Sequence, residues 1–439
     1  MSTAPFPSWS CVMPERKRVV ITGMSVNTPL GDTLDGFLEG LLQGRSAIGL
    51  YEAPGLVAGV AGSLSPYDPL SKASALRDRI PADAANRLLK LVRYSAWSTK
   101  LSVLLALDAF LDAGLVPGSV DPERIASVVT GHNINQLYVH HNWEMFARDP
   151  EDAGIDLTVF VKKWDSDHAG CVSEVIGIRG PVYLVGGACA SGNVGLRCVL
   201  DEIRHHDIDV ALVVGPVFDY TPFTLHSLVR MGAISFHRYR DDPARASRPF
   251  DADRDGFVFS HGGAGLVLEG LEHALARGAR IYAEMVGVEV GSASSRTPTP
   301  SEEHEARVME RLVHQTGTDL REIDFVSAHA TSTVLGDLAE IRAIRRVFGK
   351  HAANLKINAP KSMLGHTTWS AAVVETVASV LQMHAGWLHP SINIDRLDPE
   401  IDLDVCANRK VKHSINLMLN NAFGFAGVNS ASLIRRYAG

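Results

Sequence analysis

The chain has 439 residues, of which 46% are hydrophobic, and its formal net charge is -7. This length allows two domains, or one large domain built from two halves, with an ample core. The negative charge gives no reason to expect nucleic acid or a membrane surface as a partner, but it does not exclude an acidic protein partner. No apolar run approaches the length of a membrane span, and the N-terminus lacks a signal-peptide pattern.

The five cysteines are odd in number and widely spaced along the chain. This usage predicts free thiols in a reducing compartment, and we therefore expect a cytoplasmic protein. Residues 1–17 are expected to form a loose tail before the fold begins.

Predicted strands and helices alternate through the first half of the chain. Strands are expected at residues 18–22, 182–185 and 210–214, and helices at 101–113 and 193–204. The order strand, helix, strand forms a βαβ unit, so a mixed or parallel sheet covered by helices is expected.

The alternation restarts after Gly278, with strands expected at 281–290, 323–328 and 355–358 and helices at 303–315, 336–348 and 369–384. Two series of similar size suggest a duplicated α/β fold. We place its N-terminal half at 18–278 and its C-terminal half at 279–439.

Cys189 stands among residues with almost no side chain, in the stretch VGGACASGNVG (185–195). A structural cysteine packs well between larger aliphatic residues, so the small neighbours indicate that a substrate approaches the thiol. The cysteine lies between a predicted strand and a predicted helix, and a helix N-terminus stabilises a thiolate. We interpret Cys189 as a nucleophile, with a core cysteine on a tight turn as the alternative.

Two histidines lie at predicted strand-to-helix junctions rich in hydroxyl groups. His329 ends an apolar strand in VSAHATSTVLGD, and His366 lies in APKSMLGHTTWSAAVVE. Either histidine alone is most simply a hydrogen-bonded loop residue. Together with a strand-end cysteine in a duplicated α/β fold, they become candidates for oxyanion donors or acid–base groups.

Two further stretches carry glycines near possible sites. NNAFGFAGVN (420–429) alternates glycine and phenylalanine before a closing strand, as in a flexible, closely approaching loop or a plain β-bulge. DADRDG (251–256) has the start of a calcium loop, but Gly262 stands at the twelfth position, where that loop needs a bidentate glutamate. We therefore do not expect calcium binding.

Together these stretches resemble the β-ketoacyl-ACP synthases, the elongating condensing enzymes of fatty-acid and polyketide assembly. The likeness runs nearly end to end, from RVVITGMSVNTPLG (18–31) through FDADRDGFVF (250–259) to the phenylalanine loop. It implies an α/β, thiolase-like duplicated βα fold, layered αβαβα with two mixed sheets. The N-terminal half would carry the nucleophile and the C-terminal half both histidines.

The resemblance also implies a role for each matching residue. Cys189 would take the acyl group as a thioester. His329 and His366 would hydrogen-bond the malonyl thioester carbonyl and stabilise the enolate left when carbon dioxide departs, as two neutral donors in a dry pocket can. The remaining matches are a supporting ion pair (Lys361 and Glu375), a gating phenylalanine whose amide completes an oxyanion hole with that of Cys189 (Phe425), and two threonines that contact the phosphopantetheine arm (Thr331 and Thr333).

Several residues depart from the family's pattern near these motifs. Trp369 stands where the second histidine motif normally has glycine. An indole at that position must displace backbone or fill a pocket, so we expect a narrowed cavity and a small acyl group. The other departures are Ala330, Ala372, His261, Ala422, Ala426 and the stretch TGHNINQ (130–136).

Two alternatives to a condensing enzyme stay open. GHNINQ and GGACASGNVG also resemble a polyketide subgroup that only decarboxylates malonyl-ACP, supplying acetyl-ACP for β-branching, but that subgroup typically has serine in place of Cys189. A catalytically silent chain-length-type subunit would usually lack the cysteine, which makes it the weaker alternative. A thiolase is not expected, because the closing motif offers phenylalanine and glycine in place of a second catalytic cysteine.

The resemblance implies an acyl carrier protein as partner, and a homodimer. No dinucleotide-binding fingerprint is present, so we expect no bound cofactor beyond the phosphopantetheine arm that the carrier brings. His132, His140, His141 and His168 form no convincing metal-ligand pattern, and we expect them to be surface histidines and the protein to hold no metal.

Overall fold

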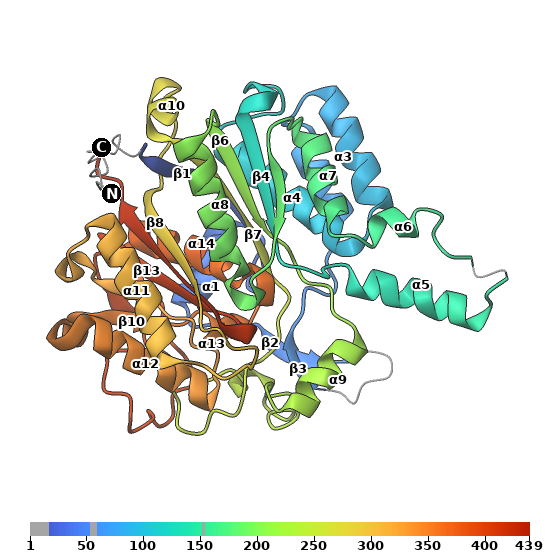
Figure 1. Cartoon of the computed structure of the whole chain (residues 1–439). Coiled ribbons are helices and arrows are strands. Elements are labelled where there is room, and N and C mark those ends of the chain that lie inside the picture. Colours follow the sequence, from blue (N-terminus) through green and yellow to red (C-terminus); the bar gives the residue numbers. More distant parts are fainter. Residues whose placement is uncertain (1–16, 53–58, 152–153) are drawn as a thin grey trace, which may run out of the picture.

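The computed structural model describes residues 17–52, 59–151 and 154–439 (Figure 1). Cys11 and the predicted tail, apart from Lys17, lie outside the described residues. Strands and helices alternate as the apolar patterning predicts, and the described residues form an α/β fold with a mixed sheet. No helix in the described ranges is both long and apolar enough to cross a bilayer.

A ten-stranded sheet of order β10-β9-β13-β14-β8-β1-β7-β6-β4-β5 forms the frame. Its N-terminal five strands pair in parallel and antiparallel fashion, and so do its C-terminal five. The bounds are β1 (Val19–Asn27), β4 (Ile125–Thr130), β5 (Val182–Val185), β6 (Val210–Gly215), β7 (Gly263–Gly270), β8 (Ala283–Ser292), β9 (Phe325–Ser327), β10 (Lys356–Asn358), β13 (Leu417–Phe423) and β14 (Val428–Arg436).

The two mixed sheets implied by the resemblance are joined, which corrects that expectation. Val20 pairs with Glu284 and Ile21 with Ala283, so β1 and β8 connect the two five-stranded halves. The inner edge strand of each half gains backbone hydrogen-bond partners in this way. Two small hairpins lie apart from the frame: β2 (Ile48–Tyr51) with β3 (Gly59–Gly62), and β11 (Trp387–Leu388) with β12 (Val411–Lys412).

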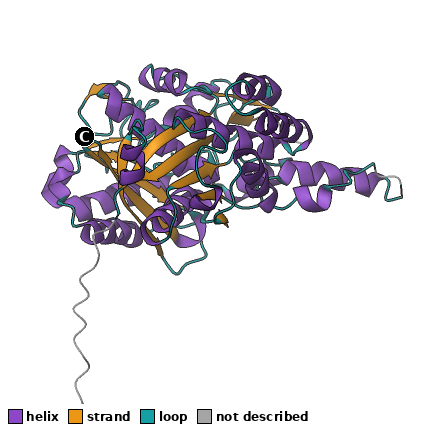
Figure 2. Ribbon diagram, turned by 90° about the horizontal axis from the view of Figure 1, so that it is seen from above, coloured by secondary structure: helices purple, strands orange, loops and turns teal. Residues whose placement is uncertain are grey.

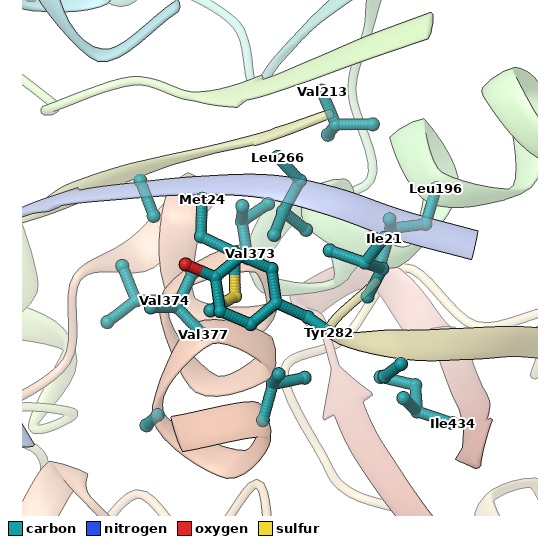
Figure 3. Close-up of a cluster of buried hydrophobic side chains, with 14 of the residues drawn as sticks. Ile21, Met24, Leu196, Val213, Leu266, Tyr282, Val373, Val374, Val377 and Ile434 are labelled. Atoms are coloured by element: carbon teal, nitrogen blue, oxygen red, sulfur yellow. The ribbon is translucent and has the colours of Figure 1, made fainter. Parts of the chain in front are cut away.

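Two central helices, α8 (Ser191–His205) and α14 (Ala371–Ala385), pack against strands of both halves and against each other. Helix α14 is buried on every side from Ala371 to Met383, as expected for a helix that is apolar all round. Its Val373 and Val377 lie in one cluster with Met24 of β1, Val213 of β6 and Leu196 of α8 (Figure 3). This shared core fixes the starts of both central helices.

Outer helices cover the remaining faces of the sheet. Helix α4 (Trp97–Asp112) packs on β1 and β7, while α11 (Glu302–Thr316) packs on β8 and β14 beside α12 (Val334–Phe348). Helices α5 (Gln136–Arg148) and α6 (Val159–Lys162) project from the body (Figures 1 and 2). The other helices are α1 (Leu34–Leu42), α2 (Pro69–Arg77), α3 (Ala82–Tyr94), α7 (Ser166–Ile176), α9 (Pro222–Met231), α10 (Leu271–Ala276) and α13 (Lys361–Leu364).

Candidate active site

Cys189 lies in a single 3₁₀ turn, Ala188–Ala190, between β5 and the start of α8. Ala188 has a positive φ of 49°, a backbone conformation that costs a non-glycine residue about 1–2 kcal/mol. Ser191 holds the turn: its Oγ accepts a hydrogen bond from the N–H of Gly187 at 2.8 Å and donates one to the carbonyl of Ala188 at 2.6 Å. The sulfur is thus presented on a fixed turn.

Two glycines let other segments approach this turn closely. A Cβ on Gly192 would lie 2.9 Å from the backbone nitrogen of Val373, at the start of α14. A Cβ on Gly424 would lie 2.6 Å from the carbonyl oxygen of Gly187, so the phenylalanine loop lies directly against the turn. Only glycine fits at either position without moving the backbone.

The Cys189 thiol is neutral at neutral pH. Burial raises the pKa of this thiol to about 12, because the thiolate would lose its hydration; Lys361 lowers the value and Glu375 raises it. The predicted stabilisation of a thiolate by the helix N-terminus is therefore outweighed by desolvation. Proton removal needs a base within reach, and Nε2 of His366 lies 3.0 Å from the sulfur.

His329 and His366 lie together beside the cysteine. Their ring centres are 5.5 Å apart and their planes are nearly perpendicular, at 84°. Burial, with a smaller contribution from the Lys361 ammonium, lowers the pKa of both imidazoles well below the usual value, so both rings are neutral. Nδ1 of each ring has no hydrogen-bond partner in the described part of the chain.

His329 follows β9 and precedes α12, as predicted, whereas the position of His366 differs from the prediction. The short helix α13 separates His366 from β10, so this histidine lies between two helices. Lys361 begins α13 and Glu375 lies in α14, and their buried side chains form an ion pair. Burial raises the pKa of the Glu375 carboxyl, and the Lys361 ammonium opposes that rise. The pair ties together the two helices that flank His366.

Glu340 of α12 is a supporting residue that sequence reasoning missed. Its buried carboxylate accepts hydrogen bonds from the N–H of His329 at 2.9 Å, the N–H of Ala330 at 2.8 Å and the side-chain amide of Asn421 at 2.9 Å. It therefore fixes the His329 loop to the strand that leads into the phenylalanine loop. The sequence contained one signal for this role: GDLAEIRAI (336–344) places a glutamate on an otherwise apolar helix face.

One cavity of about 350 Å³ gathers most of the predicted site residues. Thr331 and Thr333 have their hydroxyl oxygens 3.1 Å apart on its wall. Phe425 is 36% exposed and also lines the cavity. The predicted residues that line it are Cys189, His329, His366, Thr331, Thr333 and Phe425.

Trp369 lies outside the lining of this cavity, in the 3₁₀ turn Thr368–Ser370. Its ring centre is 4.5 Å from that of His132 and 5.3 Å from that of Phe218. A Cβ on Gly131 would lie 2.8 Å from the Trp369 side chain, so the indole fills the space beside the TGHNINQ stretch.

The other departures from the family's pattern are buried or strained. Ala372 packs with Ala422 and with the residue after the nucleophile. His261 stacks on Tyr220 with ring centres 4.7 Å apart, and burial lowers its pKa to about 4. Ala330 is buried, and Ala426 has a positive φ of 61°.

The possible metal ligands have structural contacts. Asp251 forms a buried ion pair with Arg248 and accepts a hydrogen bond from the N–H of Asp253 at 2.8 Å. His168 corrects the surface prediction, because it is buried with Nδ1 2.9 Å from Ser102 Oγ, in the contact between α7 and α4. Across residues 17–52, 59–151 and 154–439, no group of three or more His, Cys, Asp or Glu could hold a metal ion.

Known proteins resemble the chain over nearly its whole length. The chloroplastic 3-oxoacyl-[acyl-carrier-protein] synthase I of Hordeum vulgare is 33% identical over 425 residues, covering 94% of this chain and 88% of that protein. The polyketide biosynthesis malonyl-ACP decarboxylase PksF of Bacillus subtilis is 31% identical over 433 residues, covering 97% of each. A solved type II polyketide synthase acyl carrier protein in complex with its ketosynthase bound to the hexaketide matches with a TM-score of 0.83 and 26% identity, over 96% of this chain and 100% of that one.

The family match covers both halves of the chain. The beta-ketoacyl synthase N-terminal domain matches residues 16–274, and the beta-ketoacyl synthase C-terminal domain matches residues 282–395. The domain division at residue 278 stays a prediction. The thiolase-like fold that the resemblance implies is confirmed by ketosynthase structures. The chain belongs to the beta-ketoacyl synthase family, the acyltransferase-type condensing enzymes of fatty-acid and polyketide biosynthesis.

Proposed function

We propose that this protein is a β-ketoacyl-ACP synthase that decarboxylates malonyl-ACP and condenses the enolate with an acyl group carried on Cys189. The observation that carries this proposal is the convergence of one sulfur and two neutral imidazoles on one cavity. Nε2 of His366 is 3.0 Å from Sγ of Cys189, and His329 lines the same cavity.

The first half of the reaction is acyl transfer. Sγ of Cys189 attacks the thioester carbonyl of an acyl-ACP while Nε2 of His366 accepts the thiol proton. A new carbon–sulfur bond forms, the bond to the carrier's sulfur breaks, and the departing sulfur takes the proton. The backbone N–H groups of Cys189 and Phe425 would bind the oxyanion, and the close approach of Gly424 to the turn supports that pairing.

The second half begins with decarboxylation. A neutral imidazole carries one N–H, so His329 and His366 can each donate a hydrogen bond to the malonyl thioester oxygen. The bond from the α-carbon to the carboxylate breaks, carbon dioxide leaves, and the electron pair enters the enolate. The enolate carbon attacks the acyl carbonyl on Cys189, the bond from that carbonyl to the sulfur breaks, and the thiolate takes a proton from solvent. Desolvation makes each donor effective, because no water competes for the developing charge.

A dedicated malonyl-ACP decarboxylase is the second candidate, and Trp369 is the observation that favours it. The indole occupies space against His132 and Phe218, and none of these three residues lines the site cavity. Little room then remains for an acyl chain, and PksF carries the decarboxylase name.

Product analysis by mass spectrometry separates the two candidates. Wild type and Cys189→Ala are incubated with malonyl-ACP, with and without an acyl-ACP primer. A β-ketoacyl product that needs both primer and thiol supports the synthase. Acetyl-ACP as the sole product of both proteins supports the decarboxylase, and no reaction of malonyl-ACP contradicts both.

We propose that the macromolecular partners are an acyl carrier protein and a second copy of this chain. The cavity beside Thr331 and Thr333 supports the carrier as a partner, and so do relatives whose names specify carrier-bound substrates. The edge strand β5 supports the second copy as a partner. It lies at one end of the sheet, and its Val182, Tyr183 and Leu184 are 37–39% exposed. An apolar edge strand of this kind pairs readily with its own copy.

Light scattering during size-exclusion chromatography tests the dimer. Wild type is expected at about twice the chain mass of 47.4 kDa, and Val182→Lys at the monomer mass. Leu275→Lys, on the exposed face of α10, is the matched control and leaves the dimer intact. A monomeric wild type contradicts the dimer.

The free thiols Cys171, Cys189, Cys198 and Cys406 support a place in the reducing cytoplasm.

A further inference from the structure

A buried carboxyl group that the proposed mechanism does not use lines the same cavity. Glu305 lies in the first turn of α11, which runs beside α12 over the C-terminal half (Figure 1). Its side chain is only 1% exposed, and its Oε2 has no hydrogen-bond partner among the described residues. The backbone N–H of Ser301 hydrogen-bonds the carboxyl group, so only Oε2 lacks a partner among the described residues. An unsatisfied buried polar atom costs about 1–3 kcal/mol, so this oxygen beside a cavity indicates a missing ligand.

The surroundings of Glu305 favour the protonated form of its carboxyl group. Glu340 faces it from α12, Glu302 lies on its own helix, and His329 and Asp255 line the same cavity. Burial, followed by the negative charge of Glu340, raises the pKa of Glu305 well above the usual value. A protonated carboxyl offers one O–H donor and one carbonyl acceptor side by side.

We propose that Glu305 is a substrate-binding residue that hydrogen-bonds the amide of the phosphopantetheine arm nearest the thioester sulfur. This inference rests on the proposed function, because it assumes a carrier-bound thioester in the cavity. The O–H of Glu305 donates a hydrogen bond to the amide carbonyl; the N–H of a trans amide points the opposite way and does not meet the same carboxyl.

The position of Glu305 in the cavity supports the choice of this amide. Glu340 holds Ala330, which lies between His329 at the reacting end and Thr331 on the wall assigned to the arm. Glu305 lies next to Glu340, and it is therefore placed beside the part of the arm that directly follows the thioester. A neutral amide is also the better ligand on electrostatic grounds, since the malonyl carboxylate would bring a second negative charge next to Glu340.

The test combines two protein variants with two carriers. Release of carbon dioxide is measured with malonyl-ACP bearing the natural arm, and with malonyl-ACP whose amide nearest the sulfur is replaced by two methylene groups. The variants are Glu305→Ala, which removes the carboxyl, and Glu305→Gln, which keeps a donor and an acceptor without a charge. Glu303→Gln, on the exposed face of the same helical turn, is the matched control.

With the natural arm, Glu305→Ala is expected to lower kcat/KM about tenfold, mainly by raising KM. With the altered arm, the same variant is expected to lower kcat/KM less than about twofold. Glu305→Gln is expected to stay within about twofold of wild type on both arms, as is Glu303→Gln. An equal loss on both carriers, or no loss on either, overturns the role of Glu305. A wild type that releases no carbon dioxide from the natural carrier overturns the proposed function instead.

Discussion

Nε2 of His366 lies 3.0 Å from Sγ of Cys189, although 177 residues separate them in the chain. Cys189 lies two residues before α8, and His366 precedes α14 by one short turn. Because α8 and α14 pack against each other in the central layer, the distance between base and nucleophile depends on the core between the two halves. Residues of that core therefore position the site without touching substrate.

The neutral state of the Cys189 thiol can be tested by its alkylation rate. Burial raises its pKa to about 12, so below that value the reactive thiolate fraction increases tenfold for each unit of pH. We expect the rate of iodoacetamide labelling at Cys189, followed by peptide mass spectrometry, to rise steadily from pH 7 to 9. A plateau within that range would indicate a preformed thiolate–imidazolium pair, contrary to the structure.

The two imidazoles are expected to govern decarboxylation. His329→Ala and His366→Ala each remove a donor to the developing enolate, and loss of one such donor lowers kcat by about 10²–10³-fold. Carbon dioxide release from malonyl-ACP measures the effect. His314→Ala removes an exposed histidine of α11 and serves as the control. A loss below about threefold in both site variants would show that the imidazoles do not carry this step.

The Lys361–Glu375 pair is expected to matter for stability as well as for the site. Lys361→Met leaves an uncompensated buried carboxylate, and breaking a buried pair in this way costs about 3–5 kcal/mol. Asp83→Asn, which breaks the exposed Arg87–Asp83 pair of α3, should change stability by less than about 1 kcal/mol. Urea unfolding measures both. Equal small effects would mean that water reaches the Lys361–Glu375 pair.

Trp369 does not line the cavity, but its indole fills space that a longer acyl chain would need, so we expect it to limit the length of the acyl group. Trp369→Ala removes the indole that packs on His132 and Phe218, and should let longer acyl groups load onto Cys189 while costing about 3 kcal/mol of stability. Competition among acyl-ACPs of increasing length measures the change. Tyr94→Ala removes an exposed aromatic side chain and should alter neither property. An unchanged length preference would place the limit elsewhere.

Sequence patterns predicted the main strands and helices because these depend on local features. The apolar period predicts β6 and α14, and the small residues around Cys189 indicate that a substrate approaches the thiol. The β1–β8 pairing could not be predicted in this way, since it joins the two halves through only two residue pairs.

Other features depend on contacts between distant segments, which a single sequence does not reveal. The role of Glu340 becomes visible only when α12 lies beside the His329 loop, and His168 is buried only because α7 packs on α4. Trp369 was expected to narrow the cavity, but its indole lies outside the cavity lining, in space that Gly131 leaves free because it has no side chain. The desolvation that keeps the Cys189 thiol protonated likewise follows from burial by several elements.

The most direct test of the nucleophile is the mass of the intact protein after incubation with an acyl-ACP and no malonyl-ACP. Wild type should gain the mass of one acyl group, located on the peptide that contains Cys189 and sensitive to hydroxylamine, while Cys189→Ala should gain none. A wild-type protein that stays unmodified while it still releases carbon dioxide from malonyl-ACP would contradict the condensing role of this thiol.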